Sequence, residues 1–375
     1  MSARLELVPW SAALDPPLVT ARGARSTRRG WWVRLSADVG EGLGEAACWP
    51  GFGAGVRATR RALRRAAAEP LLLTRLSAAA LAGDEPALQA ALERSPAGAA
   101  PEARAALETA ALDLAAREGG RPLAAWLWPA PRERVLVHAL VSDAAGARRA
   151  VAEGAEALKL KVGFEAAPAE RARLSAVRAA VGPAVRLRLD ANGAWSADEA
   201  LRRLEGLAPL GIDLIEQPVP AGDLDGLRRT RAAGVPVAAD EGLRGPEDLE
   251  ALLRAAACDA VVLKPLFLGG LLPARALALR SVGAGLRVIV THGLESAVGR
   301  AAALALAAGL PDLREPHGLG PALRGEPAPQ GGALRPAARP GLGLNPLLAP
   351  LLARGDQRDR RGERPTPCAA AGGGV

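Results

Sequence analysis

The feature that most constrains this sequence is a series of short β-rich segments that each end in a polar residue. Successive ends are 24 to 29 residues apart, enough for one strand and one returning helix. Parallel strands joined by crossover helices are therefore expected, and the fold class is α/β. The ends are Lys161, Asp190, Glu216, Asp240, Lys264 and Thr291.

Two architectures share this rhythm. A (β/α)-barrel of the TIM type gathers every strand end around one rim, where barrel enzymes assemble their sites. A doubly wound open sheet would not bring six strand ends to a common centre. We therefore predict the barrel.

The chain divides by pattern into four parts. Residues 1–125 mix strand-like runs with helical periodicity and form a smaller α+β domain. Residues 126–317 form the barrel, and the Gly/Pro-rich segment 318–350 packs back on the first domain. Residues 351–375 lack apolar periodicity and are expected to be disordered. Helices are expected at 56–68, 72–82, 85–92 and 101–117.

Composition narrows the class of protein. The net charge is +8, but three Phe and no Tyr leave few aromatic platforms for nucleotide bases. Apolar runs are too short to span a membrane, and three Cys are too few for a disulfide framework. We expect a cytoplasmic protein with no nucleic-acid or membrane partner. The oligomeric state stays open, and a homo-oligomer is compatible with the sequence.

Only three of the 48 basic residues are Lys, and all three lie at or near predicted strand ends. Lys159 and Lys161 alternate on one strand, so both side chains enter the barrel mouth, and Lys264 ends another strand across from them. Arg stays protonated, whereas a Lys amine lowered in pKa by a neighbouring ammonium can accept a proton. We predict Lys161 as the general base. The alternative is that the lysines only neutralise acidic neighbours.

Asp190, Glu216 and Asp240 end three consecutive strands, so their carboxylates converge. Three oxygen ligands without His or Cys suit a hard cation, and we predict Mg²⁺, with Mn²⁺ as a substitute. Simple pairing of these acids with Arg is the alternative.

Further polar residues lie close to these strand ends. Arg188 and Asn192 flank Asp190 and either bind a substrate carboxylate or support the site. Glu295 and Ser296 open the helix after the last strand, either as part of an anion site or, for Ser296, as a helix cap. His292 is expected to line the pocket rather than act as the base, since no carboxylate ends the preceding strand to orient it.

The segments LKLKVG, RLDANGAW, IEQPV, ADE and VLKPLFLGG occur in this order and spacing over residues 133–316. Together they resemble the enolase superfamily in its muconate-lactonizing-enzyme subgroup. GEAACWPGFG and PGLGL resemble the capping-domain segments of that subgroup. The resemblance implies a modified (β/α)7β barrel with an N-terminal α+β capping domain.

The resemblance also implies roles for single residues. A Lys-x-Lys strand supplies the base, three carboxylates bind Mg²⁺, and a Lys on the sixth strand faces the base. Capping-domain loops, here residues 18–29 and 49–52, would select the substrate. The substrate-binding set would include Phe52 and Gly269 in addition to the polar residues above.

The partner that the resemblance implies is a small-molecule carboxylate substrate. The activity implied is abstraction of the proton alpha to that carboxylate, followed by dehydration. Racemisation or epimerisation at the same site is the nearest alternative, because lysines on two faces suit both reactions. A Schiff-base aldolase using Lys264 and a non-catalytic binding barrel remain as other classes.

Overall fold

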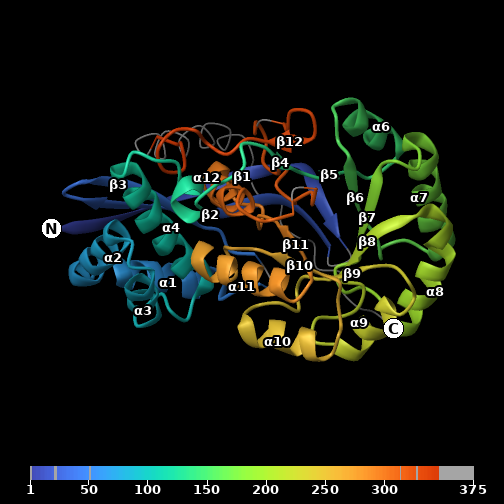
Figure 1. Ribbon diagram of the computed structural model, residues 1–375, viewed down its shortest axis with the longest axis horizontal. Coiled ribbons are helices and arrows are strands. Elements are labelled where there is room, and N and C mark those ends of the chain that lie inside the picture. The colour runs from blue at the N-terminus through green and yellow to red at the C-terminus, as the bar shows by residue number, and fades with distance from the viewer. Residues whose placement is uncertain (1, 21–22, 50–51, 313, 327, 346–375) are drawn as a thin grey trace, which may run out of the picture.

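The computed structural model describes residues 2–20, 23–49, 52–312, 314–326 and 328–345. The N-terminal strands and helices α1 to α4 lie at one end of the molecule, and the parallel sheet with its helices lies at the other (Figure 1). The predicted α/β class, with a strand-containing N-terminal cap beside a barrel, is confirmed.

The cap is a three-stranded antiparallel sheet in the order β1-β2-β3. Helix α4 packs against β3 so closely that a Cβ at Gly44 would collide with the carbonyl of Ala106. Only glycine permits this approach. The cap elements are β1 Ala3–Thr20, β2 Gly23–Ala37, β3 Gly40–Ala46, α1 Gly55–Ala67, α2 Pro70–Ala82, α3 Glu85–Glu93 and α4 Pro101–Glu118.

The barrel contains seven parallel strands in sequential order. Its strands are β5 Ala139–Leu140, β6 Ala157–Lys161, β7 Arg186–Asp190, β8 Ile212–Glu216, β9 Val237–Ala239, β10 Ala260–Leu263 and β11 Arg287–Val290. Its helices are α6 Ala144–Ala152, α7 Ala167–Val181, α8 Ala197–Leu207, α9 Leu224–Arg231, α10 Pro246–Arg254, α11 Leu271–Gly283 and α12 Ala297–Ala307.

Two residues of the following segment close this sheet. His317 bridges to Val137 beside β5, and Gly318 bridges to Thr291 at the end of β11, both in parallel sense. The His317 imidazole adds to the closure, because its Nδ1 accepts a hydrogen bond from the Val290 N–H at 3.1 Å. Residues 317–318 thus stand where the eighth strand of a (β/α)7β barrel is expected.

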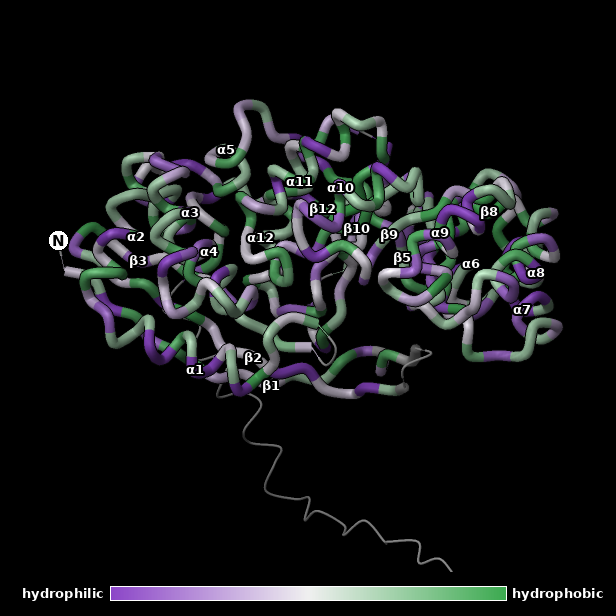
Figure 2. Tube along the Cα trace, turned by 90° about the horizontal axis from the view of Figure 1, so that it is seen from below, coloured by the Kyte–Doolittle hydropathy of each residue, from purple (hydrophilic) through white to green (hydrophobic). Residues whose placement is uncertain are grey.

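Alternation along the strands separates an outer and an inner core. Outward-facing residues such as Leu158 and Leu160 belong to the large core under the helices. A small inner cluster fills the barrel with Leu214, Ala238, Ala260, Val262 and Ile289. Polar and apolar stretches alternate along the helices that cover this core (Figure 2).

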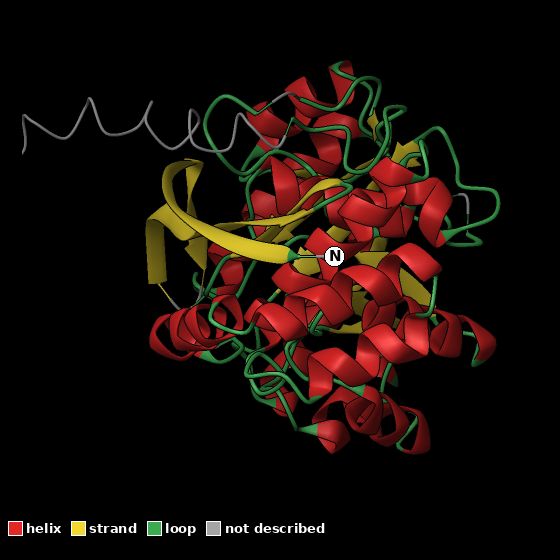
Figure 3. Ribbon diagram, turned by 90° about the vertical axis from the view of Figure 1, so that its left-hand side faces the viewer, coloured by secondary structure: helices red, strands yellow, loops and turns green. Residues whose placement is uncertain are grey.

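Strands β1 and β2 form a hairpin much longer than the sequence suggested (Figure 3). The segment 18–29, expected to be a substrate-selecting loop, is largely strand: pairing continues through Leu18 with Arg25. The register shifts between Ala13 and Leu18, where Pro16 and Pro17 cannot donate ladder hydrogen bonds. The loop prediction for 18–29 was therefore wrong.

Short elements connect the cap, the barrel and the C-terminal segment. They are α5 Leu123–Leu127, a one-turn helix Ala208–Leu210, β4 Val135–Leu136 and β12 Ala333–Leu334, and β12 pairs with β4. Near its described end the chain reaches α4, where the Leu342 N–H donates to Asp113. The division at residues 125, 317 and 350 stays a prediction, and 351–375 lies outside the described residues.

Four buried carboxylates hold these parts together by accepting backbone N–H groups. Glu45 on β3 accepts from Ser296 at 2.8 Å and Gly299 at 2.9 Å, at the start of α12. On α4, Glu108 accepts from Leu271 and Leu272 at the start of α11. The cap therefore satisfies the free N-terminal donors of two barrel helices.

Two more residues of α4 act in the same way. Glu102 accepts the Ala54 N–H at 3.1 Å, which fixes the chain just before α1. Asp113 accepts the Leu43 N–H at 2.8 Å and the Leu342 N–H at 2.6 Å, so it joins β3 to the C-terminal segment. Together with Glu108, these residues let one buried helix anchor four separate stretches of chain.

We predict that Glu108 makes stability depend on pH. Burial raises the pKa of Glu108 from 4.5 to about 7, despite hydrogen bonds from Gln89 and Leu272. The folded state therefore holds the proton more tightly, so the stability from this carboxyl is complete below pH 4.5 and is lost as pH rises through 7. The Tm of the wild type should fall relative to that of Glu108→Gln across this range, measured by circular dichroism.

Glu93→Gln, at an exposed carboxyl of α3, is the control and should leave the pH profile of the Tm as in the wild type. A Glu108→Gln profile that runs parallel to the wild type would contradict the role of Glu108.

Among the described residues, no helix combines the length and the apolar character that crossing a membrane requires.

Candidate active site

Strand β6 delivers two lysines to the barrel interior. Leu158 and Leu160 belong to the outer core, so Lys159 and Lys161 face inward between them. Lys161 lies beside Asp190 in the strand register, and Asp190 lies beside Glu216. Three neighbouring strands therefore place an amine and two carboxylates at the same level.

The lysines lie between the carboxylates. Lys159 Nζ is 2.7 Å from an oxygen of Asp190 and 2.7 Å from one of Glu216. Lys161 Nζ is 2.6 Å from Asp190, and Lys264 Nζ, directly after β10, is 2.5 Å from Asp240. Lys159, Lys161, Asp190 and Glu216 are thus joined by direct contacts, and the Lys264–Asp240 pair acts on Glu216 electrostatically. We call these six side chains the lysine and carboxylate cluster. Thr291, the remaining strand end, instead donates to the Gly318 carbonyl at 2.7 Å.

Charge in this cluster is unevenly balanced. Burial lowers the pKa of Lys159, but Asp190 and Glu216 raise it by more, so it lies above its ordinary value. The pKa of Lys264 is likewise raised, because Asp240 outweighs burial. For these two amines the nearby carboxylates, and not the neighbouring ammonium groups, decide the direction of the pKa shift.

The carboxylates are shifted in opposite directions. The pKa of Asp190 lies well below its usual range, because Lys159 and Lys161 together outweigh its burial. Burial and the Asp190 charge raise the pKa of Glu216 to about 8 although Lys159 contacts it. The pKa of Asp240 is raised by burial, which Lys264 only partly offsets. Burial thus raises the pKa of two of the three acids although each of them contacts a lysine amine.

The contacts between the lysines and the carboxylates bear on the predicted magnesium site. Within the described chain, no three His, Cys, Asp or Glu side chains are grouped as a preformed metal site, and lysine amines bridge the acids instead. The donor chemistry nevertheless fits Mg²⁺, because Asp190, Glu216 and Asp240 are buried carboxylates at the ends of adjacent strands and supply the oxygen ligands that this ion prefers.

Two residues that the sequence reasoning did not single out belong to the cluster. Asn192, which was predicted, accepts from Lys161 at 2.9 Å and donates to Glu241 at 3.2 Å. Glu241 therefore extends the acidic side of the site. Gln217 is fully buried, and its Oε1 accepts the Asp240 N–H at 2.9 Å, which fixes that strand end. Gln217 directly follows Glu216 in the sequence and Glu241 directly follows Asp240, and these positions were the signal that could have revealed both residues.

Leu140 was also missed. It pairs in register with Lys159 on the neighbouring strand, and its side chain is 53% exposed. Val137, Ala139 and Val141 pack on the outer core, so alternation turns Leu140 inward. It gives the lysine side of the barrel mouth an apolar wall.

Phe52 links the cap to the cluster. Its ring stacks on Phe267 with centroids 5.0 Å apart, and Lys264 Nζ lies 4.6 Å from its centroid. The predicted Phe52 is thus at the site. Gly269 instead packs toward the cap, where a Cβ would come within 2.8 Å of the Arg104 guanidinium.

Arg188 lies in the barrel interior, where each of its three guanidinium nitrogens already donates to a group of the protein. Its side chain is 2% exposed, and it contacts Asp213 at 2.9 Å, Glu315 at 2.5 Å and the Pro316 carbonyl at 2.7 Å. The supporting role, rather than the substrate-binding role, matches these contacts. Predicted substrate binding by Arg188 is therefore corrected.

We predict that Arg188→Met destabilises the fold. The change leaves the buried Glu315 without one of its partners, so the free energy of unfolding should fall by about 3–5 kcal/mol. Arg202→Met is the control, because Arg202 forms an exposed pair with Glu199 and should cost less than about 1 kcal/mol. Urea denaturation measures both. An Arg188→Met protein as stable as the wild type, but with a raised KM, would restore the substrate-binding role.

Residues of the N-terminal cap form hydrogen bonds with the loop between β11 and α12. Ser296 caps α12, and its Oγ donates to Glu45 at 2.6 Å while it accepts from Trp32. The N-terminus of α12, predicted as an anion site, is therefore already occupied by the Glu45 carboxylate. Of the two roles predicted for Ser296, the correct one is that of the N-cap residue of this helix.

The two other predicted residues of this loop are also buried. His292 Nε2 donates to the Gly320 carbonyl at 2.8 Å, and burial lowers the pKa of His292 to about 4. Burial and Glu45 raise the pKa of Glu295 to about 7. Glu295 thus lies beside the cap residue Glu45, and Arg28 of β2 donates to the Gly293 carbonyl in the same loop at 2.6 Å, whereas His292 contacts the C-terminal segment.

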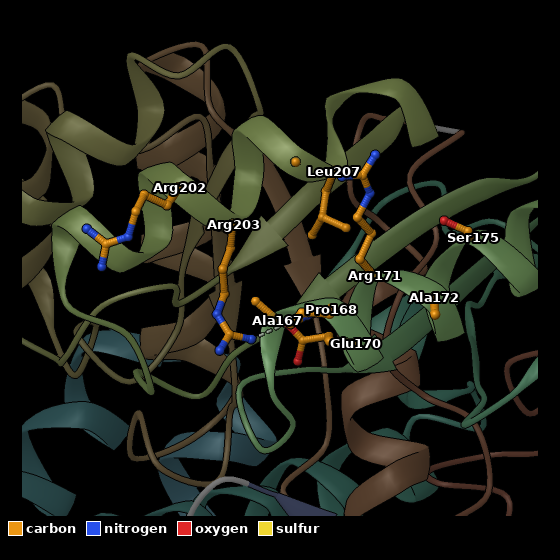
Figure 4. Close-up of a pocket in the computed structure, with 10 residues that line it drawn as sticks. Ala167, Pro168, Glu170, Arg171, Ala172, Ser175, Arg202, Arg203 and Leu207 are labelled. Atoms are coloured by element: carbon orange, nitrogen blue, oxygen red, sulfur yellow. Dashed lines mark hydrogen bonds and ion pairs between the residues drawn. The ribbon is translucent and has the colours of Figure 1, made fainter.

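A hollow of about 480 Å³ lies elsewhere, between α7 and α8 on the outside of the barrel (Figure 4). Arg203 and Glu170 in its wall form an ion pair at 2.7 Å. None of its lining residues belongs to the lysine and carboxylate cluster, so we assign it no part in the chemistry.

Comparison with known proteins agrees with this barrel. The family model described as Enolase C-terminal domain-like matches residues 142–348. The chain therefore belongs to the Enolase C-terminal domain-like family, within the enolase superfamily.

Among curated relatives, the o-succinylbenzoate synthase of Thermobifida fusca (strain YX) is 41% identical over 198 residues, which cover 51% of this chain and 61% of the relative. The chain thus matches about three fifths of that relative's length.

Two solved structures share the whole fold. The N-succinyl Arg/Lys racemase from Bacillus cereus ATCC 14579 superposes with a TM-score of 0.83 at 25% identity and covers 94% of this chain and 98% of that one. The dipeptide epimerase from Enterococcus faecalis V583, solved with Mg and the dipeptide L-Leu-L-Tyr, has a TM-score of 0.80 at 24% identity and covers 92% and 99%.

Proposed function

We propose that this chain is an o-succinylbenzoate synthase, a Mg²⁺-dependent carbon-oxygen lyase of the cytoplasm. It would dehydrate 2-succinyl-6-hydroxy-2,4-cyclohexadiene-1-carboxylate in menaquinone biosynthesis. The observation that carries the proposal is the cluster of three lysines around three buried carboxylates at the strand ends. The 41% identity to the Thermobifida fusca synthase favours this substrate.

Lys161 is the proposed base. Its Nζ contacts one carboxylate and the Asn192 amide oxygen, whereas Lys159 is held between two carboxylates. Lys161 is therefore the less strongly paired amine of strand β6. In its neutral form it would take the proton alpha to the substrate carboxylate, and Lys159 would remain a fixed cation.

The same nitrogen completes the elimination. Lys161, now an ammonium, passes the proton to the departing hydroxyl, which leaves as water while the ring becomes aromatic. Lys264, on the other side of the carboxylates, would stabilise the negative charge that develops on the substrate's carboxylate oxygens. Phe52 and Leu140 would exclude water from the apolar ring.

Asp190, Glu216 and Asp240 are the proposed ligands of Mg²⁺, with Mn²⁺ as a substitute. The ion would supply positive charge next to the substrate carboxylate. For the acids to bind it, the lysine amines that now bridge them would have to release them.

The first test is a spectrophotometric assay of o-succinylbenzoate formation. Turnover should require a divalent cation: EDTA should abolish it, and added Mg²⁺ or Mn²⁺ should restore it. Undiminished turnover in EDTA would contradict the metal site, and absence of turnover with Mg²⁺ would contradict the substrate.

A racemase or epimerase acting at this site is the second candidate, which the two solved structures favour. Lys161 and Lys264 would then exchange a proton from opposite faces of one carbon. Incubation with N-succinyl amino acids in deuterated water should show no exchange at the alpha carbon if the synthase is the correct assignment. Rapid exchange without o-succinylbenzoate formation would favour the racemase.

We predict that Lys161→Arg, Lys264→Arg and Glu216→Gln each reduce kcat by at least about 10³-fold while the fold persists. Each change keeps the approximate size and removes one chemical function. Arg202→Gln, at an exposed residue of α8, is the control and should keep wild-type kcat. A wild-type kcat for Lys161→Arg would contradict the role of Lys161 as the base and would favour the Schiff-base aldolase or the non-catalytic binding barrel as the function of this chain.

A further inference from the structure

Helix α1 carries a continuous stripe of arginines on its exposed face. They lie at positions i, i+3, i+4, i+7 and i+8, a spacing that places them along one side of a helix. We call this set the arginine stripe: Arg57, Arg60, Arg61, Arg64 and Arg65. All five are exposed.

The opposite face of α1 holds the helix on the cap. Thr59, Ala62, Leu63 and Ala66 are buried there. Since the buried residues point away from the stripe, the arginines extend into solvent from a helix that is fixed in place. The helix contains no acidic residue.

The stripe differs from the exposed arginines of α8 and α9, which have acidic partners. On α8, Arg202 pairs with Glu199 at 2.8 Å, and on α9, Arg229 pairs with Asp198 at 2.5 Å. Among the described residues, no side chain forms an ion pair or hydrogen bond with any arginine of the stripe. Five like charges therefore stand together without internal compensation, which the chain's average composition conceals.

An exposed apolar side chain flanks each end of α1. Val56, in the first turn, is 57% exposed, and Leu71, which follows at the start of α2, is 74% exposed. Cationic side chains with apolar neighbours suit the boundary between lipid headgroups and acyl chains. A nucleic-acid duplex would bind the arginines through its phosphates, but it offers no apolar surface for Val56 and Leu71.

We propose that the arginine stripe is a docking surface for an anionic phospholipid bilayer. The arginines bind the headgroup phosphates, Val56 and Leu71 reach the boundary with the acyl chains, and the helix goes no deeper because its buried face holds it on the cap. The proposal is independent of the catalytic cluster and departs from the expectation of no membrane partner.

The test is co-sedimentation with vesicles. The wild type should bind vesicles of 70% phosphatidylcholine and 30% phosphatidylglycerol at low salt, should not bind pure phosphatidylcholine, and should be released by 0.5 M NaCl. The triple variant Arg60→Gln, Arg61→Gln and Arg64→Gln should lower the partition coefficient on the order of 10- to 100-fold.

The control removes the same charge elsewhere. Arg148→Gln, Arg149→Gln and Arg171→Gln lie on exposed positions of α6 and α7 and should change partitioning less than about threefold. Circular dichroism and thermal melting verify that both triple variants fold. Absence of wild-type binding, or equal losses in the two triples, would overturn the proposal. Tighter binding to duplex DNA at the same salt, lost with the stripe, would also overturn it in favour of a nucleic-acid surface.

Discussion

Buried negative charge is the constraint on which this structure depends. A carboxylate removed from water must find donors or cations inside the protein, or else take up a proton. This chain places Glu45, Glu102, Glu108 and Asp113 in the cap, and Asp190, Glu216 and Asp240 in the barrel, all nearly or fully buried. The two groups meet the constraint differently, and the difference separates structural support from candidate chemistry.

In the cap, the carboxylates accept backbone N–H groups. Glu45 and Glu108 reach the first turns of α12 and α11, so the ends of two barrel helices are completed by residues of another part of the chain. The loops that precede these helices carry Lys264 and His292. The cap therefore does more than cover the barrel mouth, because it fixes the backbone from which part of the candidate site extends.

In the barrel, the donors are lysine amines. Unlike a helix N–H, an amine at the end of a side chain is not fixed by the backbone, and binding of Mg²⁺ by these carboxylates would require its release. The pKa of Glu216 is raised because burial and the Asp190 charge outweigh the contact with Lys159. Amines and carboxylates in direct contact inside the barrel suit proton transfer next to an anionic substrate.

The sequence by itself determined the strand period, the inward direction of Lys159 and Lys161, and the convergence of Asp190, Glu216 and Asp240, because side-chain alternation and βα spacing are local properties. Only the tertiary structure decided between the alternative roles of Arg188 and Ser296. Their partners, Glu315 and Glu45, lie 127 and 251 residues away in sequence. The same holds for the arginine stripe: its spacing is local, but its lack of acidic partners depends on which side chains the fold brings near α1.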